Sequence, residues 1–195
     1  MRFHLGAIPS SPDFVPDASW RSLRQPSPWL EKLLVLAIGV VAAVVVAALW
    51  FLVTPLRDVT PAVSLPAFLL SFAGIVVVRE LIHALVHPMA GRSPHSIVGS
   101  GPTSCYAHYD GELSRNRLVA ILLMPLLIII IVPLLVSAVT QVSSGWAAFV
   151  SAFNAFCACA DMLEAGLVLF QVPATGIVRY QSLRIHWREH DTLAA

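Results

Sequence analysis

Glu80 and His83 lie three residues apart in a long apolar stretch, which is the spacing of the second half of an HExxH helix. In that motif two histidines, four residues apart, bind one zinc ion, and the glutamate activates the metal-bound water. The position of the first histidine is taken by Arg79, whose guanidinium has no lone pair for a metal. The run RELIH therefore keeps the glutamate and one histidine of the motif and lacks the other histidine.

Further polar residues lie in the same stretch and in a later apolar one. His87 follows one helical turn after the motif histidine, and Asn154 and Asp161 share a face of the last apolar stretch. An ionised side chain inside a bilayer costs several kcal/mol, so two charged stripes at matching depth predict a site between two helices. The simpler alternative is an ion pair of Arg79 with Asp161 or Glu164 that only fixes how the helices pair.

The composition predicts an integral membrane protein. Of the 195 residues, 57% are hydrophobic and 12% are charged, and the mean hydropathy is +0.79. Soluble domains carry about 25% charged residues, so this chain cannot cover a water-facing surface, and the same apolar composition excludes intrinsic disorder. The net charge of +1, with scattered basic residues, excludes an electrostatic nucleic-acid binder. Three cysteines do not make a disulfide framework.

Four apolar runs are long enough to span a hydrocarbon core, which needs about 20 residues of helix. They predict an all-α integral membrane fold of four transmembrane helices with a short cytoplasmic β-type segment, in a single membrane domain over residues 1–195. The cytoplasmic arm is 1–32, the helices are 33–54, 62–86, 118–140 and 146–170, and the cytoplasmic tail is 171–195. The third run contains Pro125 and Pro133, where kinks are expected.

The basic residues predict the orientation of these spans. Ten of them lie in the arm, the loop 88–117 and the tail, whereas Arg57 alone lies on the opposite side. The excess of Lys and Arg marks the cytoplasmic side, so both termini are expected there. Residues 104–109 have strand character, and residues 183–188 alternate in a way typical of a half-buried strand or of a segment at the membrane interface.

The stretch VRELIHAL at 78–85 resembles a family of small bacterial membrane proteins, the zincin peptidases, whose corresponding segment resembles HELIHA. Further landmarks of the resemblance are PSPW at 26–29, YAHY at 106–109, LSRNR at 113–117, Asn154 with Asp161, and QVP at 171–173. The family is similar in turn to the site-2 proteases, which cleave transmembrane or membrane-adjacent peptides. The resemblance covers nearly the whole chain and implies a multi-pass protein of a bacterial cell membrane.

The resemblance also implies a role for each matching residue. His83 and Asp161 would be zinc ligands, and Glu80 would be the general base. Asn154 would help to hold the substrate or the oxyanion. The implied cofactor is zinc, and the implied partners are the lipid bilayer and a peptide or transmembrane-segment substrate, with no nucleic acid.

Arg79 leaves three explanations open. The metal site can be shifted by one turn, so that His83, His87 and Asp161 bind zinc. Arg79 can instead replace the metal electrostatically and pair with Asp161, which gives a catalytically inactive pseudoprotease. The arginine can also be a substitution, natural or introduced, at a position that is normally histidine.

The sequence therefore predicts one of three functions. The first is a membrane-embedded zinc metallopeptidase that cleaves peptide bonds near the cytoplasmic membrane face, with an extended substrate added to the strand at 104–109. The second is a non-catalytic binder of membrane segments, held by an Arg79–Asp161 ion pair. A small transporter is the third and is disfavoured, because the four helices show no sign of an inverted repeat.

Overall fold

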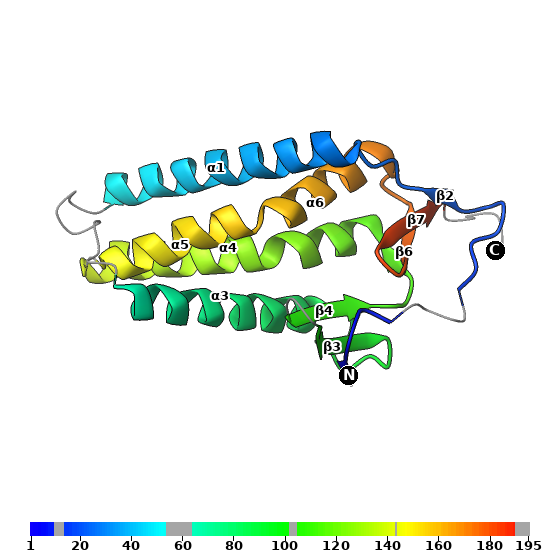
Figure 1. The fold of residues 1–195 in the computed structure, drawn as a ribbon, viewed down its shortest axis with the longest axis horizontal. Coiled ribbons are helices and arrows are strands. Elements are labelled where there is room, and N and C mark those ends of the chain that lie inside the picture. Colours follow the sequence, from blue (N-terminus) through cyan, green and yellow to red (C-terminus); the bar gives the residue numbers. More distant parts are fainter. Residues whose placement is uncertain (10–13, 54–63, 102–104, 143, 190–195) are drawn as a thin grey trace. The chain divides into compact units, whose positions relative to one another are not determined.

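The structure is a computed structural model that describes residues 1–9, 14–53, 64–101, 105–142 and 144–189. Within these ranges the chain forms five helices and seven strands (Figure 1). Three helices are long and apolar enough to cross a membrane, and a fourth span results if α5 and α6 form one bent span. Thr54, Arg57, Ala62 and Ser104, which the sequence analysis used, lie outside the described residues.

Helices form over all four predicted apolar runs. Their bounds are Pro28–Val53 (α1), Leu65–Val86 (α3), Arg115–Thr140 (α4), Gly145–Cys157 (α5) and Cys159–Gln171 (α6). Helix α1 begins at a proline, which suits the first helical position because its missing N–H would have no partner there. Helix α4 continues through Pro125 and Pro133, although each removes one backbone hydrogen bond.

The last predicted helix, 146–170, is not one continuous element. Helices α5 and α6 are bent by 50° at Ala158, whose φ of −79° and ψ of 4° depart from helical geometry. The Ala158 N–H bonds to the carbonyl oxygens of both Asn154 and Phe156. Neither Pro nor Gly, the usual sequence marks of a bend, lies at this position, so the sequence gives no warning of the break.

The chain divides into two compact units. The helical unit comprises Pro26–Arg79 and Met124–Leu163. Its core lies where α1, α4 and α5 meet, with buried Val46, Trp50, Ile130, Ala148 and Ala155. Gly39 permits this packing of α1, because a Cβ there would lie 3.0 Å from the carbonyl oxygen of Phe156.

The strand unit comprises Met1–Gln25, Glu80–Leu123 and Glu164–Ala195. One sheet has the order β1-β3-β4 and the other β2-β7-β6-β5. The strands are Arg2–Leu5 (β1), Arg21–Ser22 (β2), Ser96–Ser100 (β3), Cys105–Tyr109 (β4), Leu113–Ser114 (β5), Ile177–Gln181 (β6) and Arg184–Arg188 (β7). Among the described strands, β1 and β3 pair in parallel and the other pairs are antiparallel. The core of the strand unit includes the buried residues Leu118, Val168, Val178 and Ile185.

The β structure is more extensive than the two short segments for which the sequence predicted strands. The strand predicted at 104–109 is confirmed as β4, and the one at 183–188 as β7. Ile185 and Trp187 of β7 are buried in the core, which confirms the half-buried strand for this segment. The predicted polar arm contributes β1 and β2, which pair with strands distant in the sequence. Both strands are too short to show an alternating pattern of apolar and polar residues.

Candidate functional site: a motif helix with an arginine at the ligand position

Helix α3 carries the RELIH run near its C-terminal end. In the helical unit, Arg79 forms an ion pair with Asp161 through its Nη2 atom. The side chains are only 10% and 22% exposed. A planar guanidinium beside a carboxylate is among the stronger pairings that proteins make, and removal from water strengthens it. The ion pair that the sequence offered as an alternative to a metal site is therefore formed.

The bend between α5 and α6 places Asp161 in the first turn of α6. The N-terminal end of a helix carries a partial positive charge, which favours a carboxylate there. The carboxylate of Asp161 is thus stabilised by its own helix as well as by Arg79. A continuous helix from 146 to 170 would not have supplied this second contribution.

Asn154 completes this cluster from α5. Its side chain is fully buried, and its Oδ1 accepts a hydrogen bond of 3.4 Å from Nη1 of Arg79. Its Nδ2 is buried and makes no hydrogen bond within the described residues. A buried amide donor without an acceptor is costly, and it is therefore available to a carbonyl oxygen that enters the site.

Glu80, the next residue of α3, contacts a strand in the strand unit. Its Oε2 accepts a hydrogen bond of 2.6 Å from the backbone N–H of Ala107 in β4. Among the described strands β4 is an edge of its sheet, and Ala107 faces away from β3. Glu80, the predicted general base, thus occupies the backbone N–H to which an additional strand would bond.

His83 contacts a carbonyl that a proline has left without a helical partner. In α4 the carbonyl of Ile121 would accept from the N–H of residue 125, but that residue is Pro125. Nδ1 of His83 lies 2.8 Å from the Ile121 oxygen and donates to it. This bond fixes the tautomer of His83, with the proton on Nδ1.

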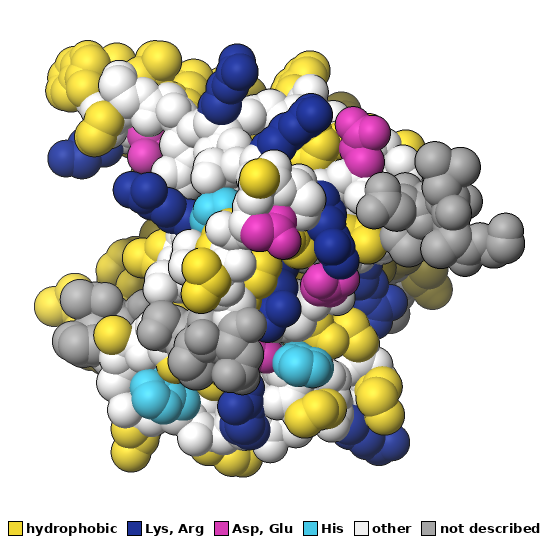
Figure 2. Space-filling view, turned by 90° about the vertical axis from the view of Figure 1, so that its right-hand side faces the viewer, with side chains coloured by type: hydrophobic (Ala, Val, Ile, Leu, Met, Phe, Trp, Pro, Cys, Tyr) yellow, Lys and Arg dark blue, Asp and Glu magenta, His cyan; other side chains and the backbone are white. Residues whose placement is uncertain are grey.

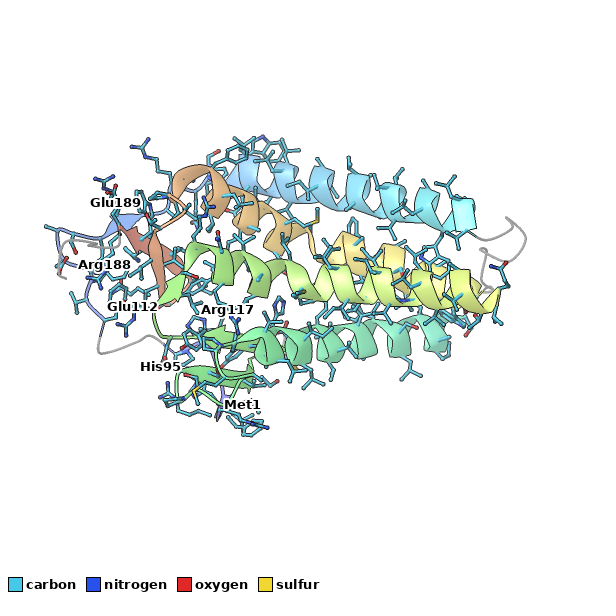
Figure 3. All side chains as sticks on the ribbon, turned by 180° about the vertical axis from the view of Figure 1, so that it is seen from behind. Met1, His95, Glu112, Arg117, Arg188 and Glu189 are labelled. Carbon is cyan, nitrogen blue, oxygen red and sulfur yellow. The ribbon has the colours of Figure 1, made fainter. Side chains whose placement is uncertain are left out.

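His87 lies just beyond α3 and is only 1% exposed. Its ring packs edge-on against Tyr109, with ring centroids 5.4 Å apart, and its carbonyl accepts a hydrogen bond of 3.1 Å from Arg117, labelled in Figure 3. Burial lowers the pKa of His87 from its ordinary 6.5 to about 4, with smaller contributions from His83, His108 and Arg117. His87 is therefore a neutral, packed side chain at neutral pH.

The donors that are present do not fit a zinc ion. The first ligand position is a cation, and the carboxylate of Asp161 is paired with that cation. Within the part of the chain that the structure describes, no group of three or more His, Cys, Asp or Glu side chains is arranged to hold a metal. The ligand roles of His83, His87 and Asp161 therefore stay predictions.

Several partners of the motif residues were missed by the sequence analysis. The N–H of Ala107 and the carbonyl of Ile121 are backbone groups, which leave no mark in residue types. Only Pro125, four residues after Ile121, signalled a carbonyl in need of a donor. Glu164, which the sequence suggested only as an alternative partner for Arg79, accepts a hydrogen bond from the hydroxyl of Tyr180.

Residues 72–177 match the sequence model of a family described as "Putative zincin peptidase". The match covers more than half of the chain and includes α3 from residue 72 onward, the β3–β4 hairpin, α4, α5 and α6. The chain belongs to this family, which confirms the zincin resemblance seen in the sequence. No curated protein and no solved structure matches the chain.

Proposed function

We propose that this protein is a non-catalytic member of the zincin peptidase family that binds peptide or transmembrane segments. The observation that carries the proposal is the ion pair between Arg79 and Asp161. The guanidinium supplies a fixed positive charge where the family places a metal ligand, and it engages the carboxylate that would otherwise bind the metal. The scaffold is kept, and the metal is replaced by a side chain.

The energetics of the pair argue against zinc binding in the presence of Arg79. A zinc ion that took Asp161 as a ligand would leave the guanidinium buried without its partner. An uncompensated buried charge costs about 3–5 kcal/mol. The like charges of Zn²⁺ and the guanidinium would also repel each other in a medium of low dielectric constant. Both contributions lower the zinc affinity.

The apolar helices support a location in the membrane. Three or four of them have the length and composition of spans, and a buried ion pair between spans is one of the few forms in which charges are tolerated there. The distribution of Lys and Arg supports cytoplasmic termini in a multi-pass protein of a bacterial cell membrane. The arm, the loop 88–117 and the tail, which carry the strands, would then lie on the cytoplasmic side.

The ligand class follows from the edge of β4. An extended peptide can add to an exposed sheet edge through backbone hydrogen bonds, with little demand on its sequence. The outward N–H of Ala107 is held by Glu80, so a peptide carbonyl that bound there would take the place of the carboxylate. Glu80 would then limit access to the edge and take no part in catalysis.

Zinc analysis of the purified protein tests the proposal. Elemental analysis should find no stoichiometric zinc in the parent or in Asp161→Ala, and about one zinc per chain in Arg79→His, which restores the HExxH pattern. The variant Arg79→His with Asp161→Ala should lose that zinc again. Arg92→His is the matched control, because it adds a histidine at an exposed position.

The alternative function, a zinc metallopeptidase, predicts the opposite zinc content. About one zinc per chain in the parent, lost in Asp161→Ala, would favour the shifted site of His83, His87 and Asp161 and would overturn the proposal. Cleavage of membrane-anchored peptides by the parent, abolished by Glu80→Gln, would do the same.

A further inference from the structure

A cavity of about 540 Å³ opens in the strand unit, away from the residues of the motif. It is lined by Arg21, Ser22, Arg24, Gln171 and Trp187. None of these residues belongs to the cluster of Arg79 or to the partners of Glu80 and His83. Figure 2 shows several Lys and Arg side chains on the face that it presents.

The backbone that carries the two arginines is held firmly. Strand β2 pairs with β7, with Arg21 opposite Trp187. Leu23, between the two arginines of the cavity, is buried in the core, and its N–H bonds to the carbonyl of Ile185 at 2.9 Å. The cavity is thus built on a sheet and not on a loose terminal segment.

Gln171 fixes the second arginine through two reciprocal hydrogen bonds. Its Oε1 accepts from the N–H of Arg24 at 2.8 Å, and its Nε2 donates to the Arg24 carbonyl at 2.9 Å. Both polar ends of the glutamine are therefore occupied by the backbone. The backbone of Arg24 is thereby fixed at the wall of the cavity.

Among the described residues no carboxylate neutralises the charge of the cavity. The Arg21 guanidinium lies 5.2 Å from the centre of the Trp187 ring, and within the described residues neither Arg21 nor Arg24 pairs with a carboxylate. Arg188, which follows Trp187, does have such a partner in Glu112 at 3.1 Å, and Figure 3 labels both. The two cavity arginines and the hydroxyl of Ser22 thus present donors to an anion.

The position of the cavity along the chain indicates the source of that anion. Gln171 is the last residue of α6, which forms a candidate span together with α5. Phospholipid headgroups lie where spans end, and arginines close to that level attract anionic lipids. Tryptophan is enriched at the same level because its ring is apolar and its N–H is polar.

We infer that this cavity binds a phosphate group, supplied by the headgroup of an anionic phospholipid. Guanidinium groups match the geometry of phosphate oxygens and bind them through paired hydrogen bonds. Bound lipid would hold the β2–β7 pairing at the membrane surface. The inference goes beyond the proposed function, because it concerns a different set of residues and requires neither a metal nor a peptide.

Native mass spectrometry of the full chain, titrated with phosphatidylglycerol in detergent, tests the site. The double variant Arg21→Gln with Arg24→Gln should raise the Kd by about 25-fold, and each single variant by about fivefold, since each arginine near a lipid surface is worth about 1 kcal/mol. Arg184→Gln is the matched control: it removes the same charge from an exposed position of β7 outside the cavity. It should bind lipid like the parent.

The arms of the experiment separate the two sources of phosphate. If millimolar inorganic phosphate competes with the lipid in the parent but not in the double variant, the phosphate site is supported and its ligand is free phosphate. Lipid binding that resists inorganic phosphate would assign it to the headgroup. Equal Kd values for the double variant and Arg184→Gln would overturn the inference. If the double variant does not fold, the two single variants still test the cavity. The result of the zinc analysis does not affect this test of lipid binding.

Discussion

The helical unit and the strand unit hold the residues of the RELIH run by different means. In the helical unit, Arg79 is held by a carboxylate and a side-chain amide from α6 and α5. In the strand unit, Glu80 and His83 contact backbone groups of β4 and α4. The first arrangement depends on two particular side chains. The second depends on the fold.

A second contrast runs along α4, where two prolines each free one carbonyl. Pro125 frees the carbonyl of Ile121, which His83 satisfies in the strand unit. Pro133 frees the carbonyl of Ile129, which accepts a hydrogen bond of 3.1 Å from the hydroxyl of Ser151 in the helical unit. In apolar surroundings a freed carbonyl needs such a partner.

The comparison between the two units shows that two residues of the RELIH run have structural roles. Glu80 and His83 each satisfy a backbone group, and neither contact needs a metal. Within the described residues Arg79 has no backbone partner of this kind, and its role depends on Asp161.

The largest effect should come from breaking the ion pair. Asp161→Ala leaves the buried guanidinium of Arg79 uncompensated and should cost about 3–5 kcal/mol. In thermal unfolding in detergent this corresponds to a drop in Tm of about 10 °C. Adding Arg79→Leu should restore most of the loss, because the charge itself is then removed.

The exposed pair of Arg188 and Glu112 provides the control. Its side chains are 37% and 40% exposed, so Glu112→Ala should cost less than about 1 kcal/mol. If Asp161→Ala costs as little stability as Glu112→Ala, the Arg79–Asp161 pair does not act as a buried ion pair that the fold depends on. Failure of Arg79→Leu to rescue Asp161→Ala would indicate a further role for the carboxylate.

A smaller effect is expected when the contact between Glu80 and Ala107 is removed. Hydrogen bonds to charged groups contribute about 1.5–3 kcal/mol, so Glu80→Ala should speed amide hydrogen exchange in Cys105–Tyr109 by about 30-fold. Glu80→Gln keeps a carbonyl acceptor and should have a weaker effect. Unchanged exchange in Glu80→Ala would show that the carboxylate does not hold this strand.

The difference between the two units also explains what the sequence could predict. The helices followed from long apolar runs. The cost of charges in such runs suggested, as one alternative, an ion pair of Arg79 with Asp161 or Glu164. Both depend on residue type. The family was recognisable from RELIH and its neighbours, and the match over residues 72–177 confirms it.

The strand unit was predicted less completely, since its contacts depend on backbone and on distant pairing. A two-residue strand such as β2 has too few residues for an alternating pattern. Its partner β7 lies at the other end of the chain, and nothing in Arg21 or Ser22 specifies that pairing. The bend at Ala158, which sets the position of Asp161, lacks the usual Pro or Gly.

The smallest of the three stability effects tests the contrast between the two freed carbonyls. His83→Ala and Ser151→Ala should each cost about 1–2 kcal/mol, since each leaves a buried carbonyl without a donor. Pro125→Ala returns an N–H to Ile121 and should remove about 1 kcal/mol of the cost of His83→Ala. Chemical denaturation of the single and double variants in detergent measures both cycles.

The crossed combinations are the controls, because each proline frees a different carbonyl. Pro125→Ala should leave the cost of Ser151→Ala unchanged, and Pro133→Ala should leave that of His83→Ala unchanged. If Pro125→Ala does not reduce the cost of His83→Ala, the Ile121 carbonyl is not what the histidine satisfies. The retention of His83 would then need another cause, and metal binding would be the first to examine. If coupling is found only for His83 with Pro125 and for Ser151 with Pro133, the role of His83 is to donate to a carbonyl that lacks a backbone N–H partner.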